Sequence, residues 1–334
     1  MRVVAFVLLL FSLLGADILK VATYNVENLF DLKKSGHEYK EYIPYSVSKW
    51  NKTNYNKKLK NLSRVIVDID ADIIALQEIE SLEALKDLKK QLKYDGLYYP
   101  YFKIANKKNT TIKVALLSKY PFVYTREVDV TSSYKFRNIL EAKFKINNTE
   151  LYLFVNHWKS KAGPESMRII SAKKLRQRIG KIGYDKNIIL LGDFNSDYEE
   201  NIKFLRKRKH NDTYGKTGIN DILRTKTQKY KAKESKYTSR GFYNLWYDVA
   251  RDERYSYIFR GKKEALDNIL ISQSLLFGNK KIHYIPSSTH HFKKPYLMKK
   301  KYIYRWQMSR KKPRKHKGKG YSDHLAVVAA FEIK

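Results

Sequence analysis

The stretch Asn187-Ile-Ile-Leu-Leu-Gly-Asp-Phe-Asn195 decides the fold of this chain. Its first five residues form a short, almost entirely apolar run, which predicts a strand buried on both faces. Gly192 follows, and then Asp193 and Asn195 with one residue between them. In an extended chain this spacing places both side chains on one face, at the rim of a core strand. Because Gly, Asp and Asn are also good turn residues, an ordinary strand exit would have the same sequence.

Other apolar runs begin or end at similar polar groups. Strand-like runs are expected at 19–26, 72–76, 113–117, 136–146, 150–155, 265–272 and 325–333, and helices at 53–68 (capped by Thr53), 82–92 (capped by Ser81), 164–182 and about 198–209. Residues 210–262 are rich in loops and aromatic residues and give no clear pattern. Strands and helices alternate without an internal repeat or a linker, which predicts one domain over 17–334.

The polar groups at the strand ends form a chemically coherent set. They are Asn25, Glu78, His157, Asp193, Asn195, Asp267, Asp323 and His324. Carboxylates and amides without any Cys suit Mg²⁺, with Mn²⁺ or Ca²⁺ as alternatives, rather than Zn²⁺. The two imidazoles can titrate near neutral pH. A hard cation, carboxylates and His in a cationic protein point to hydrolysis of a phosphate ester.

The charge of the chain favours a polyanionic partner. It has 68 Lys and Arg against 33 Asp and Glu, a formal net charge of +35. Such a protein concentrates nucleic acid, acidic polysaccharide or an anionic membrane face, although a biased genome composition explains part of the Lys count. The basic insertion 293–319 carries 13 Lys or Arg, no acid, and interleaved aromatic residues. Its cations could follow a nucleic-acid backbone while its aromatics stack on bases, or it is a solvated loop.

The first 16 residues have the pattern of a secretory signal peptide. Arg2 precedes an apolar run, 3–14, and Gly15 and Ala16 supply small residues for cleavage. A buried N-terminal strand or an uncleaved anchor would be the alternatives. The rest of the chain has no segment that predicts a membrane span, and no Cys that could form a disulfide. We therefore expect an exported protein, periplasmic or secreted, that is soluble after cleavage.

Six short motifs together resemble one known superfamily. In order they are Thr-Tyr-Asn25-Val-Glu-Asn, Leu-Gln-Glu78-Ile, Asn156-His157-Trp-Lys, Gly-Asp193-Phe-Asn195, Leu-Asp267-Asn-Ile-Leu-Ile-Ser and Ser-Asp323-His324. This order resembles the endonuclease/exonuclease/phosphatase superfamily, including its pancreatic-type deoxyribonucleases, from about residue 19 to 333. The resemblance implies an α/β four-layer sandwich, in which two mixed β-sheets pack face to face and helices cover both outer sides. It also implies that the strand ends converge on one rim.

The resemblance also implies a role for each matching residue. Glu78 would be the main metal ligand, with Asn25 and Asp323 near the metal or its waters. Asp193 would orient or deprotonate the attacking water, and Asn195 would hold the phosphate or the nucleophile. His157 and His324 would bind phosphate oxygens and transfer protons, with Asp267 orienting His324. Arg137 either reaches a phosphate or is a surface cation on a strand.

Some positions depart from the family pattern or lack a motif. Some deoxyribonucleases have an Arg shortly after the metal-binding Glu, where this chain has Ile79 and Glu80, and His157 has no identifiable carboxylate partner. Glu27 is expected to be a solvated residue at a strand end rather than a second acid near the metal. The remaining His residues are expected on the surface: His37, His210, His283, His290, His291 and His316.

Three functions from different classes remain open at this point. The favoured one is an exported, monomeric, metal-dependent nuclease that acts on DNA in preference to RNA. The second is a phosphodiesterase or phosphatase acting on a lipid headgroup, although no tandem-aromatic hairpin for membrane insertion is evident. The third is a non-catalytic cationic protein that binds nucleic acid. The sequence does not separate DNA from RNA or endonuclease from exonuclease action, and repair of abasic sites does not suit an exported enzyme.

Overall fold

The computed structural model describes residues 17–204, 210–225, 240–276 and 281–334. One sheet contains β1 (Asp17–Leu29), β2 (Ile73–Ile79), β3 (Tyr101–Ile104), β4 (Lys113–Ser118), β13 (Ile282–Tyr284), β14 (His290–His291) and β17 (Val327–Ile333). The other contains β5 (Phe122–Val128), β6 (Ile139–Ile146), β7 (Thr149–His157), β8 (Ile188–Asp193), β9 (Phe242–Asn244) and β12 (Asp267–Ser272). The α-helices are α1 (Lys52–Ile69), α2 (Leu82–Tyr94), α3 (Glu165–Ile182) and α4 (Glu200–Lys203), and a π-helical turn, η2, spans Gly218–Ile222.

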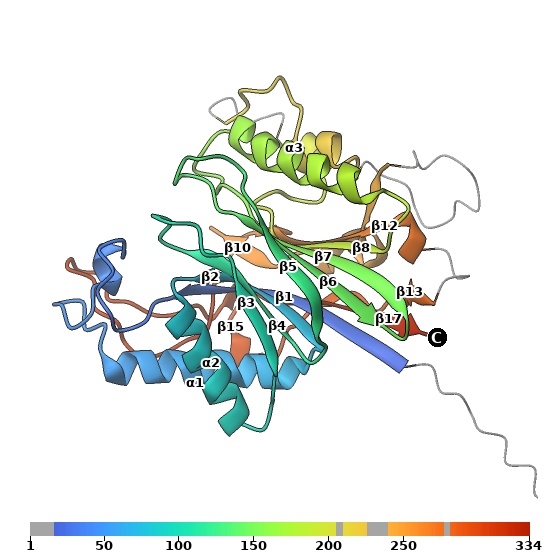
Figure 1. Cartoon of the computed structure of the whole chain (residues 1–334). Helices are drawn as coiled ribbons and strands as arrows, with labels where there is room; N and C mark the ends of the chain where they lie inside the picture. The colour runs from blue at the N-terminus through green and yellow to red at the C-terminus, as the bar shows by residue number, and fades with distance from the viewer. Residues whose placement is uncertain (1–16, 205–209, 226–239, 277–280) are drawn as a thin grey trace, which may run out of the picture.

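Both sheets are mixed. The strand order is β13-β17-β1-β2-β4-β3 in the first, with β14 also paired to β17, and β5-β6-β7-β8-β12-β9 in the second. β1 runs parallel to β2 and β7 parallel to β8, whereas the other pairs are antiparallel. Helices α1 and α2 cover the outer face of the first sheet and α3 that of the second (Figure 1). The expected four-layer sandwich is confirmed.

The alternation of side chains along the central strands builds this layering. In β1, Leu19 and Val21 point between the sheets, and Ala22 and Tyr24 point toward the helices. In β8 the inward residues are Ile189 and Leu191, while Ile188 and Leu190 pack beneath α3. A strand with two buried faces must be apolar throughout, which explains the apolar run at 188–191. Every residue of β8 is buried, so that prediction is confirmed.

Some helix boundaries differ from those expected. The cap of α1 is Asn51 rather than Thr53, and its side chain accepts a hydrogen bond from the Asn54 amide at 3.1 Å. Ser81 caps α2 as predicted, accepting from the Ala84 amide at 3.0 Å. The helix expected at 198–209 is only the short α4 within the described chain, and 205–209 lie outside it. The proposed signal peptide, 1–16, also lies outside the described residues; among the described helices, none has the length and apolar character needed to cross a membrane.

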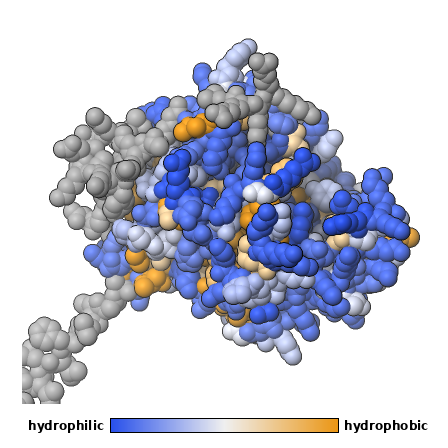
Figure 2. All heavy atoms as spheres, turned by 180° about the vertical axis from the view of Figure 1, so that it is seen from behind, coloured by the Kyte–Doolittle hydropathy of each residue, from blue (hydrophilic) through white to orange (hydrophobic). Residues whose placement is uncertain are grey.

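The basic insertion 293–319 is packed against the first sheet through buried residues, so Trp306 is not free to stack on a base, whereas Tyr302 is exposed. Trp306 is buried, and its indole N–H donates to Nδ1 of His316 at 2.8 Å. The other His316 nitrogen bonds the carbonyl of Glu41, so the ring is buried between two polar partners. The surface positions expected for His316 and His291 are therefore wrong. The cations of the segment are largely exposed, and the face seen in Figure 2 is predominantly hydrophilic.

Candidate active site

The end of β8 is where the site is assembled. Asp193 lies opposite His157 of β7 on one side and opposite Asp267 of β12 on the other. One step earlier, Gly192 has a φ of 134°, and a Cβ there would collide with the backbone of Asn156. Only glycine fits this close approach, so the packing of β7 against β8 requires the glycine of the motif.

Glu78 reaches the same rim through an irregularity in β2. The pairing of β2 with β4 shifts register between Gln77 and Ile79, and Glu78 has a φ of 68°. A bulge of this kind turns a side chain out of the regular alternation of a strand, at a cost of about 1–3 kcal/mol for a non-glycine residue. Strain of this kind is retained where the surrounding structure fixes a functional side chain, which here is the carboxylate of Glu78.

All nine predicted site residues come together at one cavity of about 670 Å³. Seven of them line it: Glu78, Arg137, His157, Asp193, Asn195, Asp323 and His324. The other two lie directly behind. Asn25 bonds Glu78 and Asp193, and Asp267 bonds His324. The cavity lies where the ends of the central strands converge, as the resemblance to the family implied.

The Asn25 amide bridges two of the carboxylates. Its nitrogen donates to Glu78 Oε1 at 3.2 Å and to Asp193 Oδ2 at 3.1 Å. Its oxygen accepts the backbone N–H of Glu27 at 3.0 Å, which orients the amide. Asn25 therefore acts here as a donor that holds Glu78 and Asp193 together, and its role as a metal ligand remains a prediction. The backbone N–H of Asn195 donates to the other Asp193 oxygen at 2.8 Å.

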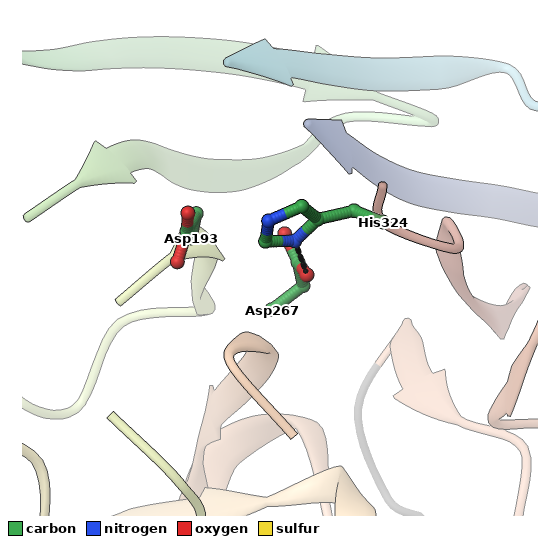
Figure 3. Close-up of side chains that lie close together, drawn as sticks. All are labelled: Asp193, Asp267 and His324. Atoms are coloured by element: carbon green, nitrogen blue, oxygen red, sulfur yellow. Dashed lines mark hydrogen bonds and ion pairs between the residues drawn. The ribbon is translucent and has the colours of Figure 1, made fainter. Parts of the chain in front are cut away.

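His324 and Asp267 form a buried pair (Figure 3). Nδ1 of His324 donates to Oδ2 of Asp267 over 2.6 Å. Burial alone would lower the pKa of this imidazole, but the charges of Asp267, Asp323 and Asp193 and the bond to Asp267 raise it well above its usual value. His324 is therefore an imidazolium at neutral pH, with Nδ1 engaged and Nε2 available to the cavity.

His157 has the opposite electrostatic character. Its Nε2 lies 3.6 Å from Asp193 Oδ2 and 3.9 Å from Glu78 Oε1. Burial, with Arg137 and His324 nearby, holds the pKa of His157 well below its usual range, so this imidazole is neutral at neutral pH. Within the described chain its buried Nδ1 has no hydrogen-bond partner. The two imidazoles thus flank Asp193 in different protonation states.

The donor set fits a hard divalent cation. Burial and then the charge of Asp323 raise the pKa of Glu78, and burial and then Asp267 raise the pKa of Asp193 to about 7. Carboxylates brought together out of water repel one another, and a divalent cation among them would lower both pKa values. Ligand atoms of Asp193, Asp267 and His324 also lie within 4.8 Å of one another, but Nδ1 of His324 already bonds Asp267. The part of Glu78 and Asp323 in holding a divalent cation, with Asp193 beside them, remains a prediction.

Sequence reasoning missed an ion-pair network that holds Asp323. Glu27 was expected to be solvated, but it is buried and accepts from Arg305 and from the backbone of Trp306. Arg305 also lies 3.1 Å from Asp323. Burial, then Asp323, raises the pKa of Glu27 to about 7. Arg305 comes from the basic insertion, so that segment fixes one wall of the site.

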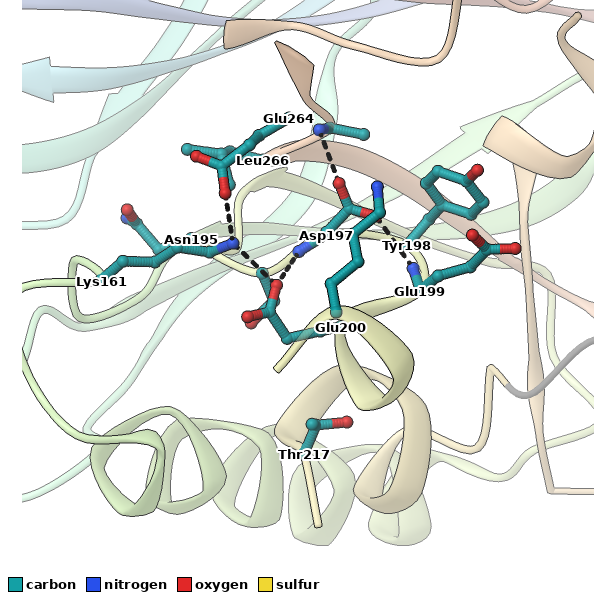
Figure 4. Close-up of polar contacts among 12 residues, drawn as sticks. Lys161, Asn195, Asp197, Tyr198, Glu199, Glu200, Thr217, Glu264 and Leu266 are labelled. Atoms are coloured by element: carbon teal, nitrogen blue, oxygen red, sulfur yellow. Dashed lines mark hydrogen bonds and ion pairs between the residues drawn. The ribbon is translucent and has the colours of Figure 1, made fainter. Parts of the chain in front are cut away.

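A second missed network supports the loop after β8 (Figure 4). Lys161 lies between Glu200 and Glu264, at 2.8 and 3.0 Å. Glu200 accepts the Asp197 amide, and Asp197 in turn accepts the amide of Ala265, just before β12. These contacts tie the chain after Asp193 to the chain before Asp267. No motif marks them, because their partners are separated widely in the sequence.

Arg168 secures the loop between β7 and α3. It is buried with Glu165, and the two are joined by a 2.6 Å ion pair. The Arg168 guanidinium also donates to the carbonyls of Lys159, Ser160 and Gly163. Glu165 accepts the backbone N–H of Gly218 at 2.8 Å with its other oxygen. This clamp holds the loop that carries Lys161 next to His157.

Arg168→Met is expected to lower the free energy of unfolding by about 3–5 kcal/mol, because Glu165 would remain buried without its charge partner. Urea denaturation of the purified variant measures this. The matched control is the double variant Glu165→Leu/Arg168→Met, which removes both charges and should recover part of the loss. Equal stability of the single variant and the unaltered protein would contradict this assignment.

Arg137 lies inside the site rather than on an outer surface. Its guanidinium donates to the carbonyl of Trp158 at 3.2 Å, and it lines the cavity together with Tyr39. Tyr39 comes from the long excursion between β1 and α1 and gave no sequence signal. Of the two interpretations of Arg137, a phosphate contact is compatible with this position, and that role remains a prediction.

The fold and the rim of carboxylates and imidazoles define a hydrolase site built between two facing sheets. The sequence matches the model of the Endonuclease/Exonuclease/phosphatase family over residues 20–225 and 215–333. The chain belongs to this family of phosphate-ester hydrolases. A comparison with curated sequences found no match.

Three solved structures illustrate the likeness. D. rerio TDP2 complexed with single strand DNA product is 15% identical, with a TM-score of 0.59, and the match covers 94% of this chain and 98% of that one. The human Nocturnin catalytic domain with bound sulfate is 15% identical, with a TM-score of 0.57 and coverage of 96% and 98%. The Bacteroides thetaiotaomicron mannosyl-6-phosphatase is 15% identical, with a TM-score of 0.55 and coverage of 94% and 99%. At this identity the likeness shows the fold.

Proposed function

We propose that the chain is an exported, metal-dependent nuclease that hydrolyses phosphodiester bonds of DNA, in preference to RNA, by in-line attack of water. The observation that carries this proposal is the convergence in one cavity of Glu78, Asp193 and Asp323 with an imidazole on either side of Asp193. The net charge of +35 supports a polyanionic substrate. The D. rerio TDP2 of similar fold binds a single strand DNA product, which supports nucleic acid in particular.

Each residue of the cavity has a proposed role in proton transfer, phosphate binding or metal binding. Asp193 accepts a proton from the attacking water while the water oxygen forms a bond to phosphorus. The bond between phosphorus and the leaving oxygen breaks in the same step. His324, held by Asp267, gives its Nε2 proton to the leaving oxygen or binds a phosphate oxygen. His157 binds another phosphate oxygen. A divalent cation held by Glu78, with Asp323, would supply charge neutralisation at the phosphate.

The substrate class can be established by one set of assays. Plasmid DNA, RNA, sphingomyelin and a sugar 6-phosphate would each be incubated with the protein, with and without Mg²⁺. Cleavage of nucleic acid alone supports the proposal. Cleavage of sphingomyelin favours the lipid phosphodiesterase, and release of phosphate from the sugar favours a phosphatase. Binding of DNA without turnover in any assay would indicate the non-catalytic cationic protein.

Location outside the cytoplasm and a monomeric state are further parts of the proposal. Cell fractionation tests the location, and light scattering of the purified protein tests the monomeric state.

Activity is expected to disappear in excess chelator and to return with Mg²⁺ or Mn²⁺, because the carboxylates cannot neutralise a phosphate by themselves. Nicking of plasmid DNA by metal-stripped protein measures this. Addition of Mg²⁺ should also raise the melting temperature, since binding to the folded state alone stabilises it. Full activity of the metal-stripped protein would contradict the mechanism.

Removing three exposed cations of the basic insertion should reduce the salt dependence of DNA binding. Each phosphate neutralised contributes about −0.9 to the slope of log K against log salt on duplex, or −0.7 on single strands, so Lys299→Gln/Lys300→Gln/Lys301→Gln should flatten the slope by roughly 2 to 3 units. The matched control changes Lys86, Lys90 and Lys93, exposed on α2, to Gln. An equal change of slope in both triple variants would mean that the insertion has no special role.

A further inference from the structure

A second groove opens beside the catalytic cavity. It lies between two small hairpins, β10 (Tyr257–Phe259) with β11 (Lys262–Glu264), and β15 (Met298–Lys299) with β16 (Tyr302–Ile303). Its volume is about 440 Å³. Tyr257, Phe259 and Asp323 line both the groove and the catalytic cavity, so the two spaces adjoin. β10 contacts β16, which keeps the hairpins together.

Neighbouring rings extend from the groove to the imidazole of His324. Phe259 is 51% exposed and Tyr302 46% exposed, so both present ring surface to solvent. Phe259 lies two residues from Tyr257 on the same strand face, and their rings are nearly parallel, 10° apart, with centroids at 6.4 Å. The Tyr257 ring lies in turn 4.8 Å from that of His324. Exposed rings in a groove next to a catalytic group mark a binding surface.

The groove is also cationic. Lys299, Lys300 and Arg260 are exposed on its walls, and Arg260 lies 5.3 Å from the Phe259 ring. Arg305 is committed to Glu27 and Asp323. Among the described residues that line the groove, Asp323 is the single carboxylate. Flat rings together with Lys and Arg form the kind of surface on which an unpaired strand binds, with bases on rings and phosphates beside cations.

We propose that this groove holds the unpaired nucleotides that flank the scissile phosphate, so that the enzyme prefers single-stranded DNA or RNA to duplex. The inference rests on the proposed nuclease function and specifies its substrate. A ring such as Phe259 or Tyr302 can stack on a base face only after the base has left its pair, since duplex bases are stacked on one another. Stacking of this kind is tolerant of sequence, so no base preference is expected.

The test compares aromatic variants by fluorescence anisotropy with a labelled oligonucleotide and with the corresponding blunt duplex, both in chelator to prevent cleavage. Phe259→Ala and Tyr302→Ala should each raise the Kd for the single strand by roughly 5- to 150-fold and change the Kd for duplex much less. Phe259→Tyr and Tyr302→Phe keep the rings and should retain binding. Tyr94→Ala, at a tyrosine 85% exposed on α2, is the matched control and should bind as the unaltered protein does.

Phe259→Leu distinguishes stacking from plain apolar contact, because Leu keeps apolar area without a flat ring. Single-strand binding equal to that of the unaltered protein in this variant would overturn the proposal. So would Ala variants that lose binding to phosphatidylglycerol vesicles but not to the oligonucleotide, since the groove would then bind a lipid surface. If the unaltered protein cleaves nucleic acid yet the variants leave the ratio of single-strand to duplex Kd unchanged, this inference fails alone. No cleavage of any nucleic acid would instead refute the proposed function.

Discussion

His324→Ala is expected to lower kcat on DNA by ~10²–10⁴-fold, the usual contribution of a positioned proton donor. The bond from Nδ1 to Asp267 and the surrounding carboxylates raise the pKa of His324, so the native ring carries a proton at neutral pH. Alanine removes both the proton and the charge that faces the phosphate. Steady-state cleavage of a fluorogenic oligonucleotide at saturating Mg²⁺ measures the effect.

The matched control is His290→Ala, which removes an exposed imidazole that does not line the cavity and should leave kcat unchanged. Asp267→Asn tests the pairing, because a neutral amide cannot stabilise the imidazolium and the pKa of His324 should fall. As the pH is raised, this variant should therefore lose activity at a lower pH than the native enzyme does. His157→Ala should also lower kcat by ~10²–10⁴-fold if it takes part in proton transfer. Near-native turnover of His324→Ala would mean that the leaving oxygen receives its proton elsewhere.

The residues that sequence patterns placed correctly share one property. Asp193, His157 and Asp267 follow or begin apolar strands, and the ends of neighbouring strands must meet at one edge. The register of β8 with its two neighbours then brings the three side chains together without any further information. The apolar runs therefore predicted the strands, whereas the two facing sheets and the shared rim were implied by the resemblance to the family.

The features that the sequence did not reveal depend on contacts over long separations. Arg305 and Glu27 are 278 residues apart, and neither stands in a pattern that marks the other as its partner. A Glu in a strand-end sequence is ordinarily solvated, but this one is buried and bonded by Arg305 and Trp306 of the packed insertion 293–319. The bulge at Glu78 is equally invisible, because a register shift between β2 and β4 is a property of two strands.

Part of the insertion 293–319 is buried, so its role is tested by substitution and not by deletion. Leu297, Ile303 and Trp306 belong to the core beneath the first sheet, so deletion of the whole segment would unfold part of the protein. Its exposed lysines can be replaced without that cost. The insertion thus combines two roles in one segment, with a buried side that fixes Asp323 through Arg305 and an exposed side that carries charge.

Asp193→Asn is expected to lower kcat by ~10²–10⁴-fold while largely preserving DNA binding, because it keeps the shape of the side chain and removes the base that accepts the proton of water. Glu78→Gln should differ, by raising the concentration of Mg²⁺ needed for half-maximal activity, since a neutral amide is a weaker ligand than a carboxylate. Both side chains accept from the Asn25 amide, and Asp193 also accepts the backbone N–H of Asn195. Mg²⁺ titrations of cleavage, with DNA affinity measured in parallel, separate them. Identical behaviour at saturating Mg²⁺ would show that the two carboxylates share one function.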